Sequence, residues 1–387
     1  MSEFASKKAK RVSDVPQSGI RRFFDLANSR EDVISLGVGE PDFPAPWHVR
    51  EACIYSLERG HTYYTSNYGL YELRELLSQS YRKRYKLDYS PEDEILITTG
   101  VSEAFDIAMR AIVDVGDEVL IPEPCYVSYA PCVRFAEGNP VYIPLSQVDF
   151  KLRYEDISSK TTEKTKALVL SYPNNPTGAI MRRKELEEVA DAVVEHDLLV
   201  ISDEVYSELT YTTRHTCFSE LNGMKERTII LNGFSKSHSM TGLRIGYALA
   251  PYDVIEAMMT IHQYSMLCAP ITAQMGAIEA LKNGWESVES MKREYDRRRR
   301  LTLSRLRNMG LPCFEAEGAF YAFPSVKETG MSSKEFEERL FKDKGVIVVA
   351  GETFGPSGEG HIRCSYANSM EKLREAFERM EEFLSGI

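Results

Sequence analysis

Between about residues 95 and 250 the chain alternates short apolar runs with segments that have the period of a helix. The apolar runs cover residues 95–99, 118–121, 167–171, 198–202, 228–231 and 247–250, and helical segments at 102–112 and 184–196 separate some of them. Short apolar runs between turns predict buried strands, and their alternation with helices favours a mostly parallel sheet. We therefore predict an α/β fold in which helices flank a mostly parallel sheet.

The rest of the 387-residue chain is long enough to form a second folding unit. From about residue 281 the pattern changes to a long helix through 307, strand candidates at 318–324, 345–350 and 361–366, and a closing amphipathic helix at 369–384. A strand candidate at 32–36 and helices at 47–58 and from about Leu70 precede the alternating region. We predict a large domain at 46–280 and a smaller α+β domain that combines residues 1–45 with 281–387.

Composition and charge exclude several classes of function. The formal net charge of -11 argues against a nucleic-acid partner, which would need a basic face. No apolar run approaches the roughly 18 residues of a membrane span, and the N-terminus has no apolar signal region. Seven cysteines without a CxxC pair fit a reducing compartment, and no cysteine or histidine spacing is typical of a metal site. We expect a cytoplasmic protein that binds no metal.

One basic run, residues 297–300, is an exception to the acidic composition. It lies in a polar stretch with helical period that begins near Trp285. We therefore interpret this run as a solvated helix face rather than as a phosphate-binding patch.

Polar groups of different chemistry follow the predicted strands. Open α/β sheets bind ligands at the carboxyl ends of their strands. The turn Thr99-Gly100-Val101-Ser102 opens a helix and offers N–H groups to an anion. The other groups are two amides, a carboxylate, a phenol and an amine, namely Asn174, Asn175, Asp203, Tyr206 and Lys236. One or two of them could be ordinary buried polar residues, but all of them together indicate a binding site.

Lys236 is the residue with the most specific chemistry. It follows a buried strand, and the segment after it carries Arg244 between Gly242 and Gly246. A desolvated ammonium has a lowered pKa, which frees the amine to form a Schiff base with a carbonyl. The alternative is that the side chain extends into solvent, as most lysine side chains do.

Two other segments could also contact a ligand. Gly37-Val38-Gly39 follows the strand candidate at 32–36, and its glycines would let N–H groups approach an anion closely. A plain turn explains this segment equally well. The loop at 61–69 is rich in tyrosines, which either pack or donate hydroxyl groups to a phosphate.

Pyridoxal phosphate needs the groups that these strand ends supply. Its aldehyde needs an amine, its phosphate an anion cradle and an arginine, its pyridinium nitrogen a carboxylate, and its phenolate oxygen hydrogen-bond donors. In that order the chain offers Lys236, the Gly100 turn with Arg244, Asp203, and the pair Asn175 and Tyr206.

At these residues the chain resembles the class I/II aminotransferases, a family of fold-type I pyridoxal-phosphate enzymes. The segment Gly233-Phe234-Ser235-Lys236, with Arg244 and Gly246 after it, agrees with the lysine signature of that family. Three further segments stand in the order that the family shows, namely Asn175-Pro176-Thr177-Gly178, residues 203–206 and the late Arg363. The resemblance covers nearly the whole chain, and it is closest to archaeal-type aspartate or aromatic aminotransferases, also in the segment 19–24.

The resemblance implies a role for individual residues. Lys236 would be the Schiff-base lysine and proton shuttle, with Asp203 and Tyr206 as the other catalytic residues. Asp203 would keep the pyridine nitrogen protonated, while Asn175 and Tyr206 would hold the ring oxygen. The phosphate would be held by Gly100, Val101, Ser102, Ser235, Arg244 and, from the neighbouring subunit, Tyr64.

The resemblance also implies contacts with the ring and with the substrate. Tyr126 would stack on the pyridine ring, with ordinary core packing as the alternative. Arg363 would bind the substrate carboxylate together with Gly39 and Asn175, unless it forms a structural salt bridge. Because Tyr64 would act across subunits, a homodimer with shared active sites is expected.

The implied reaction moves an amino group from an L-amino acid, aromatic or aspartate, to 2-oxoglutarate by a ping-pong mechanism. One aspartate-specific subgroup would carry a lysine where Ser102 stands, so the donor stays open. Alanine, LL-diaminopimelate and 2-aminoadipate are other candidate donors, and a pyridoxal-phosphate C–S β-lyase is an alternative on the same fold. The absence of a GxGxxG motif disfavours a nicotinamide dehydrogenase.

Overall fold

A computed structural model describes residues 7–13, 15 and 32–386 of the chain. The first described helix is α1 (Lys10–Ser13). The segment 19–24, which contributed to the resemblance, lies outside the described residues. Within residues 7–13, 15 and 32–386, no helix is both long and apolar enough to cross a membrane.

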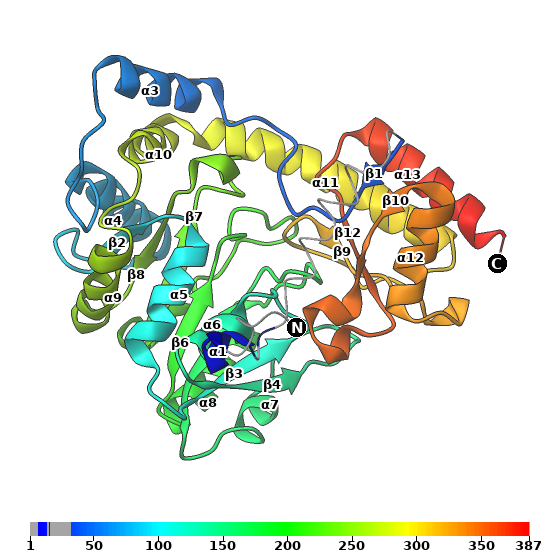
Figure 1. The fold of residues 1–387 in the computed structure, drawn as a ribbon, viewed down its shortest axis with the longest axis horizontal. Coiled ribbons are helices and arrows are strands. Elements are labelled where there is room, and N and C mark those ends of the chain that lie inside the picture. The colour runs from blue at the N-terminus through cyan, green and yellow to red at the C-terminus, as the bar shows by residue number, and fades with distance from the viewer. Residues whose placement is uncertain (1–6, 14, 16–31, 387) are drawn as a thin grey trace.

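A seven-stranded sheet with the order β2-β8-β7-β6-β5-β3-β4 forms the centre of the larger part of the molecule (Figure 1). Its strands are β2 (Ile95–Thr98), β3 (Glu118–Glu123), β4 (Asn139–Pro144), β5 (Thr165–Ser171), β6 (Leu199–Asp203), β7 (Thr228–Gly233) and β8 (Gly246–Leu249). Strand β8 is antiparallel to both of its neighbours, β2 and β7, and the other strands run in one direction. The prediction of an α/β fold with a mostly parallel sheet is confirmed.

Both faces of this sheet are buried under helices. Along β2, Leu96 packs into the core on one face, whereas Ile95 and Ile97 pack into the core on the other. The first face is covered by α5 (Val101–Ile112), α6 (Tyr129–Phe135) and α9 (Tyr252–Ser265), and the second by α4 (Tyr71–Tyr85), α7 (Tyr154–Ser158), α8 (Arg183–Glu195) and α10 (Ile271–Asn283). Because every strand residue meets a core, the central strands read as continuous apolar runs.

Strand β4 does not follow this apolar pattern, and the sequence did not predict it. It lies at the edge of the sheet, where it pairs only with β3. Its residues include Pro140 and Pro144, and the Tyr142 side chain is exposed. Prolines are tolerated in an edge strand because its outer N–H groups need no partner.

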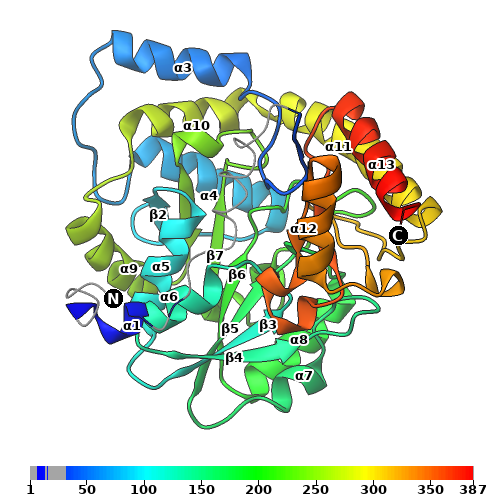
Figure 2. The same cartoon turned by 45° about the vertical axis from the view of Figure 1, so that its right-hand side comes forward.

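Helix α3 (Trp47–Glu58) lies away from the sheet and packs against α10 (Figures 1 and 2). Its outer surface carries large apolar side chains, and those of Trp47, Ile54, Tyr55 and Leu57 are exposed. Within one chain this helix therefore leaves apolar surface open to solvent.

The C-terminal part packs three helices around two small sheets (Figure 2). The helices are α11 (Trp285–Asn308), α12 (Ser333–Lys344) and α13 (Met370–Leu384). One sheet pairs β1 (Ile34–Ser35) with β10 (Val346–Ile347) in parallel, and the other has the order β11 (Val349–Ala350), β12 (Ile362–Ser365), β9 (Tyr321–Ala322). The β1–β10 pair brings residues 34–35, which precede the large sheet in the sequence, against the C-terminal part. The division at residues 46 and 280 remains a prediction.

Some predicted elements of this part differ in the structure. The long helix expected from about residue 281 is interrupted: α10 ends at Asn283 and α11 begins at Trp285, with Gly284 between them. A Cβ atom on Gly284 would lie 2.5 Å from the Ala280 carbonyl oxygen, so the chain is crowded at this junction. The strand candidate at 345–350 forms β10 and β11, which belong to different sheets. Apolar periodicity does not reveal such one-residue breaks.

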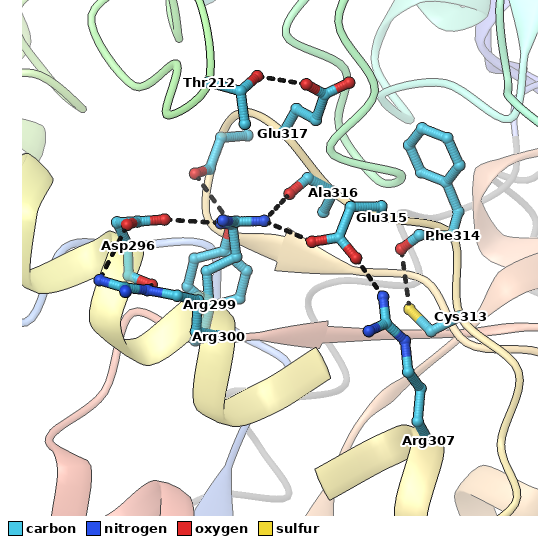
Figure 3. A network of polar contacts seen from close by, with 12 residues as sticks. Thr212, Asp296, Arg299, Arg300, Arg307, Cys313, Phe314, Glu315, Ala316 and Glu317 are labelled. Atoms are coloured by element: carbon cyan, nitrogen blue, oxygen red, sulfur yellow. Dashed lines mark hydrogen bonds and ion pairs between the residues drawn. The ribbon is translucent and has the colours of Figure 1, made fainter. Parts of the chain in front are cut away.

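The interpretation of the basic run of α11 as a solvated face is wrong for Arg298 and Arg299, whose side chains are buried. Arg298 pairs with Asp42 at 2.7 Å. Arg299 pairs with Asp296 at 2.9 Å and with Glu315 at 2.8 Å (Figure 3). Successive helix residues point in different directions, so an unbroken basic run must place some of its members towards the core. Here acidic partners make that burial possible. One of them, Glu315, also connects the loop at 313–317 to α11.

Candidate active site

A cavity of about 340 Å³ lies at the carboxyl ends of the central strands β5, β6 and β7. Residues of the C-terminal part, among them Tyr321 and Arg363, complete its wall. Most of the residues predicted for the site line it, namely Gly39, Val101, Ser102, Tyr126, Asn175, Asp203, Tyr206, Ser235, Lys236, Arg244 and Arg363. Groups that are far apart in the sequence thus face one space.

The amine of Lys236 lies in this cavity, a short turn after the end of β7. Its Nζ atom donates a hydrogen bond of 2.6 Å to the carbonyl oxygen of Gly39. Burial lowers the pKa of Lys236 to about 8, and Arg363 and Arg244 act in the same direction, whereas Glu40 and Asp203 oppose the shift. A lysine with such a pKa is partly uncharged near neutral pH, which is the form that attacks a carbonyl.

Asp203 ends β6 and is buried, with both carboxylate oxygens hydrogen-bonded. Oδ2 accepts a hydrogen bond of 2.7 Å from the Tyr129 hydroxyl, and Oδ1 accepts one of 3.2 Å from the Val205 N–H. Burial raises the pKa of Asp203, and these two hydrogen bonds and Lys236 act against the rise. A buried carboxylate that faces a cavity is suited to a cationic group of a ligand.

Tyr129 is a residue of the site that the sequence did not single out. Burial raises the pKa of Tyr129 well above the ordinary tyrosine value, so its hydroxyl stays protonated and donates a hydrogen bond to Asp203. The hydroxyl oxygen is also 3.0 Å from Ser171 Oγ at the end of β5. Its position three residues after Tyr126 was the available signal, but a buried tyrosine in a helix is equally typical of core packing.

The N-terminus of α5, where the sequence predicts an anion cradle, lies at the cavity wall. Its cap, Gly100, has a φ of 81°, a left-handed conformation that favours glycine. The guanidinium of Arg244 lies against this turn, because a Cβ atom on Gly100 would be 2.8 Å from Arg244 Nη2. Gly246 also packs closely against this turn, since a Cβ atom there would be 2.8 Å from the Val101 nitrogen. A guanidinium and free helix N–H groups therefore meet at one point.

Arg363 on β12 is buried and is held by neutral oxygens. Nη1 donates to Asn175 Oδ1 at 2.7 Å, and Nη2 donates to the Gly37 carbonyl oxygen at 2.6 Å. The Cζ atom lies 4.5 Å from the ring centre of Tyr321 and 4.7 Å from that of Phe354. Within residues 32–386 it forms no ion pair, so the alternative of a structural salt bridge is wrong there. Its charge is thus available to an anionic ligand in the cavity.

Tyr206 and Tyr321 join the two parts of the site. Their hydroxyl oxygens are 2.6 Å apart. Tyr321 also lies against Gly39, because a Cβ atom on Gly39 would be 2.2 Å from its hydroxyl oxygen. The sequence placed Tyr321 in a strand candidate but assigned it no role, since a tyrosine in a short strand is usually a core residue.

Tyr126 and Tyr64 differ in their surroundings. Tyr126 lines the cavity, and its ring meets that of Tyr129 edge-on with centroids 5.7 Å apart. Tyr64 is 78% exposed and does not line the cavity of its own chain. Its loop is held by the buried Gln274, which donates to Thr65 Oγ1 at 3.1 Å. The role of Tyr64 in a neighbouring subunit remains a prediction.

Comparison with known proteins places this geometry in context. The family model described as aminotransferase class I and II matches residues 31–380. The chain is 46% identical to an aspartate aminotransferase of Pyrococcus abyssi and 45% identical to aromatic-amino-acid aminotransferase 2 of Thermococcus litoralis, over 97% of each chain in both cases. The solved structure of an aromatic aminotransferase from Pyrococcus horikoshii superposes with a TM-score of 0.90 at 46% identity, covering 94% of this chain and 98% of that one. The fold-type I architecture implied by the resemblance is confirmed.

Proposed function

Because the chain belongs to the class I and II aminotransferase family, we propose that it transfers the amino group of an aromatic L-amino acid or of aspartate to 2-oxoglutarate, with pyridoxal phosphate as cofactor. Amino acids and 2-oxo acids are the expected substrates of an aminotransferase. The observation that carries the proposal is the position of the Lys236 amine, which shares one cavity with Asp203 and Arg363.

The polar groups that line the cavity fit pyridoxal phosphate. Lys236 would bond its aldehyde carbon, and the buried Asp203 carboxylate, which accepts a hydrogen bond from Tyr129, would pair with its ring nitrogen. Arg244 and the α5 N-terminus would hold the phosphate together with Ser235, which is buried beside Lys236. Tyr126 would cover one face of the ring.

Tyr206 and Asn175 would donate to the ring oxygen of the cofactor. Burial raises the pKa of Tyr206 well above the ordinary value, so its hydroxyl keeps a proton to donate. Its contact with Tyr321 holds that hydroxyl at the cavity wall. The Asn175 oxygen is taken by Arg363, so its amide N–H group is the one left for a ligand.

Bound pyridoxal phosphate stabilises negative charge at the substrate Cα and accepts the amino group. Once the substrate amine has displaced it from the aldehyde carbon, the free Lys236 amine would act as base and acid, taking the proton from Cα and returning it at C4′ of the cofactor. Its lowered pKa, about 8, suits both directions of that transfer near neutral pH. Asp203 would keep a proton on the ring nitrogen, so that the ring could accept the negative charge from Cα.

Arg363 would bind the substrate carboxylate. A guanidinium is planar and binds a carboxylate through two parallel hydrogen bonds, and the rings of Tyr321 and Phe354 pack against this one. Asn175 and the Gly37 carbonyl hold its two terminal nitrogens at distances of 2.7 Å and 2.6 Å. Gly39, which contacts both Lys236 and Tyr321, would contribute its backbone N–H.

We further propose a homodimer with shared active sites. Large apolar side chains are exposed on α3 and on the loop that follows it, among them Trp47, Tyr63 and Tyr64, and Tyr264 is exposed near the end of α9. Exposed apolar surface of this extent is typical of a protein interface. Tyr64 lies on that surface, as its proposed contact with the partner's phosphate requires. Location in the cytoplasm is also a proposal, supported by the seven cysteines, all of which are described and free.

The choice of donor follows from none of these contacts. Each cation of the cavity, Lys236, Arg244 or Arg363, already has a proposed use. A distal carboxylate would need another cation, but this applies to 2-oxoglutarate as much as to aspartate. The relatives named above act, by their names, on aspartate and on aromatic amino acids. Both donors are therefore retained.

Two measurements test the proposal. The protein with added pyridoxal phosphate should show a visible absorption band that donor amino acids bleach, and Lys236→Ala should lose both the band and turnover. Values of kcat/KM for tyrosine, phenylalanine, aspartate, alanine, 2-aminoadipate and LL-diaminopimelate would then rank the donors. Failure with both aromatic amino acids and aspartate would contradict the proposed specificity. Release of pyruvate and ammonia from cysteine conjugates would favour the β-lyase instead.

A further inference from the structure

A glutamate and a histidine form a pair beneath the anion cradle. Glu103 lies in the first turn of α5, directly after Ser102, and His262 lies near the end of α9. His262 Nδ1 is 2.6 Å from Glu103 Oε1. The histidine side chain is fully buried and that of the glutamate is 12% exposed. Neither residue lines the cavity or has a role in the proposed reaction.

The second carboxylate oxygen of Glu103 reaches the cradle itself. Oε2 accepts a hydrogen bond from the backbone N–H of Thr99, the residue before Gly100. A carboxylate in the first turn that reaches back to an N–H at the helix start is a capping arrangement, which fixes the path by which the chain enters the helix. Here that path includes the left-handed Gly100 and ends at the N–H groups of Val101 and Ser102.

His262 gives the carboxylate a defined orientation. A carboxylate can only accept, so Nδ1 carries the hydrogen of this contact. The other ring nitrogen, Nε2, is buried and has no partner within the described residues, which leaves Glu103 as the hydrogen-bond partner of the ring. The negative charge of Glu103 does not favour an anion nearby. The contribution of the pair to the cradle is therefore geometric.

We propose that Glu103 and His262 are positioning residues for the phosphate of the cofactor. The histidine orients the carboxylate, the carboxylate holds the Thr99-Gly100 turn, and the turn aims the α5 N–H groups at the point where Arg244 lies. This inference rests on the proposed function, because it requires a phosphate-bearing cofactor at the cradle.

The experiment compares ligands with and without a phosphate. Dissociation constants of pyridoxal phosphate and of pyridoxal, together with competition by inorganic phosphate, are measured on the protein freed of cofactor. His262→Leu should weaken pyridoxal phosphate and inorganic phosphate about tenfold, the effect of losing one charge-assisted hydrogen bond. Pyridoxal, which has no phosphate, should bind within about twofold of wild type.

A conservative variant separates positioning from packing. In His262→Asn an amide N–H can replace Nδ1–H, so most of the phosphate affinity should return. Glu103→Ala, at a partly exposed residue, should also weaken pyridoxal phosphate, by less than His262→Leu because a like charge is removed as well. It provides the same comparison if His262→Leu does not fold. His196→Leu removes a histidine that contacts Ser158, away from the cavity, and should leave all three ligands unaffected.

Several results would overturn the inference. These are an equal loss of pyridoxal and pyridoxal phosphate, a His262→Asn variant as weak as His262→Leu, or wild-type affinity in Glu103→Ala. A wild-type protein that prefers pyridoxal phosphate to pyridoxal while His262→Leu keeps the same preference would also overturn it. Failure of the wild-type protein to bind pyridoxal phosphate would instead contradict the proposed function.

Discussion

The Tyr129 hydroxyl donates a hydrogen bond of 2.7 Å to Oδ2 of Asp203, and both residues are buried. Tyr129 begins α6 and Asp203 ends β6, so this bond joins a covering helix to the sheet. It counteracts the increase that burial causes in the pKa of Asp203. The proposed role of Asp203 needs an ionised carboxylate, and Tyr129 helps to keep it ionised.

Tyr129→Phe should therefore move the acid side of cofactor binding to higher pH. A carboxylate with a raised pKa loses its charge as the pH falls through that pKa, and the variant raises the pKa further. We expect the decline in pyridoxal-phosphate affinity to begin at a higher pH than in wild type. Tyr154→Phe is the matched control, because it removes a tyrosine hydroxyl that donates a hydrogen bond to an exposed carboxylate, that of Glu195. An unchanged acid limb in Tyr129→Phe would contradict this role.

Lys236→Met should stabilise the protein without cofactor near pH 7. The pKa of Lys236 is about 8 in the folded state against an ordinary value of 10.5, so the folded protein binds this proton less tightly than the unfolded chain. The resulting destabilisation is fully present below about pH 8 and disappears as the pH rises to about 10.5. Thermal unfolding at both ends of this range measures it. A variant with a lower Tm than wild type near pH 7 would disprove the expected sign.

Arg363→Lys should raise KM for both substrates while cofactor affinity stays the same. Lysine keeps the charge but loses the planar fork that Asn175 and Gly37 hold in place. We expect KM to increase by about tenfold to a hundredfold. Steady-state kinetics with both substrates test this, and Arg379→Lys, at a surface ion pair with Glu375, serves as the control. A weaker affinity for pyridoxal phosphate would show that Arg363 acts elsewhere.

Gly100→Ala should lower both stability and cofactor affinity, whereas Gly116→Ala should lower stability alone. Both glycines have a left-handed φ, 81° and 91°, so alanine is strained at either position by about 1 kcal/mol. Only at Gly100 would the new Cβ atom meet Arg244, at 2.8 Å, because Gly116 has open space around it. Unfolding and pyridoxal-phosphate binding of the two variants separate these effects. Equal losses of affinity would place the phosphate elsewhere.

Tyr64→Phe should weaken pyridoxal phosphate only if active sites are shared between subunits. In a mixed dimer with Lys236→Ala, one site would combine an intact Lys236 with an intact Tyr64 from the other chain. We expect that site to bind with wild-type affinity, at half the wild-type number of sites. Titration of coexpressed and separately purified variants measures this. No recovery in the mixed dimer would argue against the shared site.

The sequence determined which chemical groups face the cavity. Asp203 ends the buried strand β6, Lys236 follows β7, and the Gly100 turn follows β2, which runs in the same direction as both. Strands that run in one direction place their carboxyl ends at one side of a sheet. Reading the strands and the residues after them was therefore enough to predict that Asp203, Lys236 and the cradle would meet.

The sequence did not reveal how these groups are held. Tyr129 and Tyr321 are ordinary core tyrosines by their local pattern, and Glu103 and His262 are separated by more than a hundred residues. Arg298 and Arg299 belong to a run that looked solvated, although both are buried in ion pairs.

Strand period and motif spacing depend on neighbours along the chain. They were enough to predict the fold class and to place Lys236 at the sheet edge, where the structure finds its amine in the cavity. The partners of Asp203, Arg363 and Glu103 depend on how α6, β9 and α9 pack against the sheet edge, which is decided by contacts between distant segments. Only the tertiary structure therefore decided the hydrogen bonds that orient these side chains. The orientation of a carboxylate or a guanidinium is a property of the packed site rather than of its own segment.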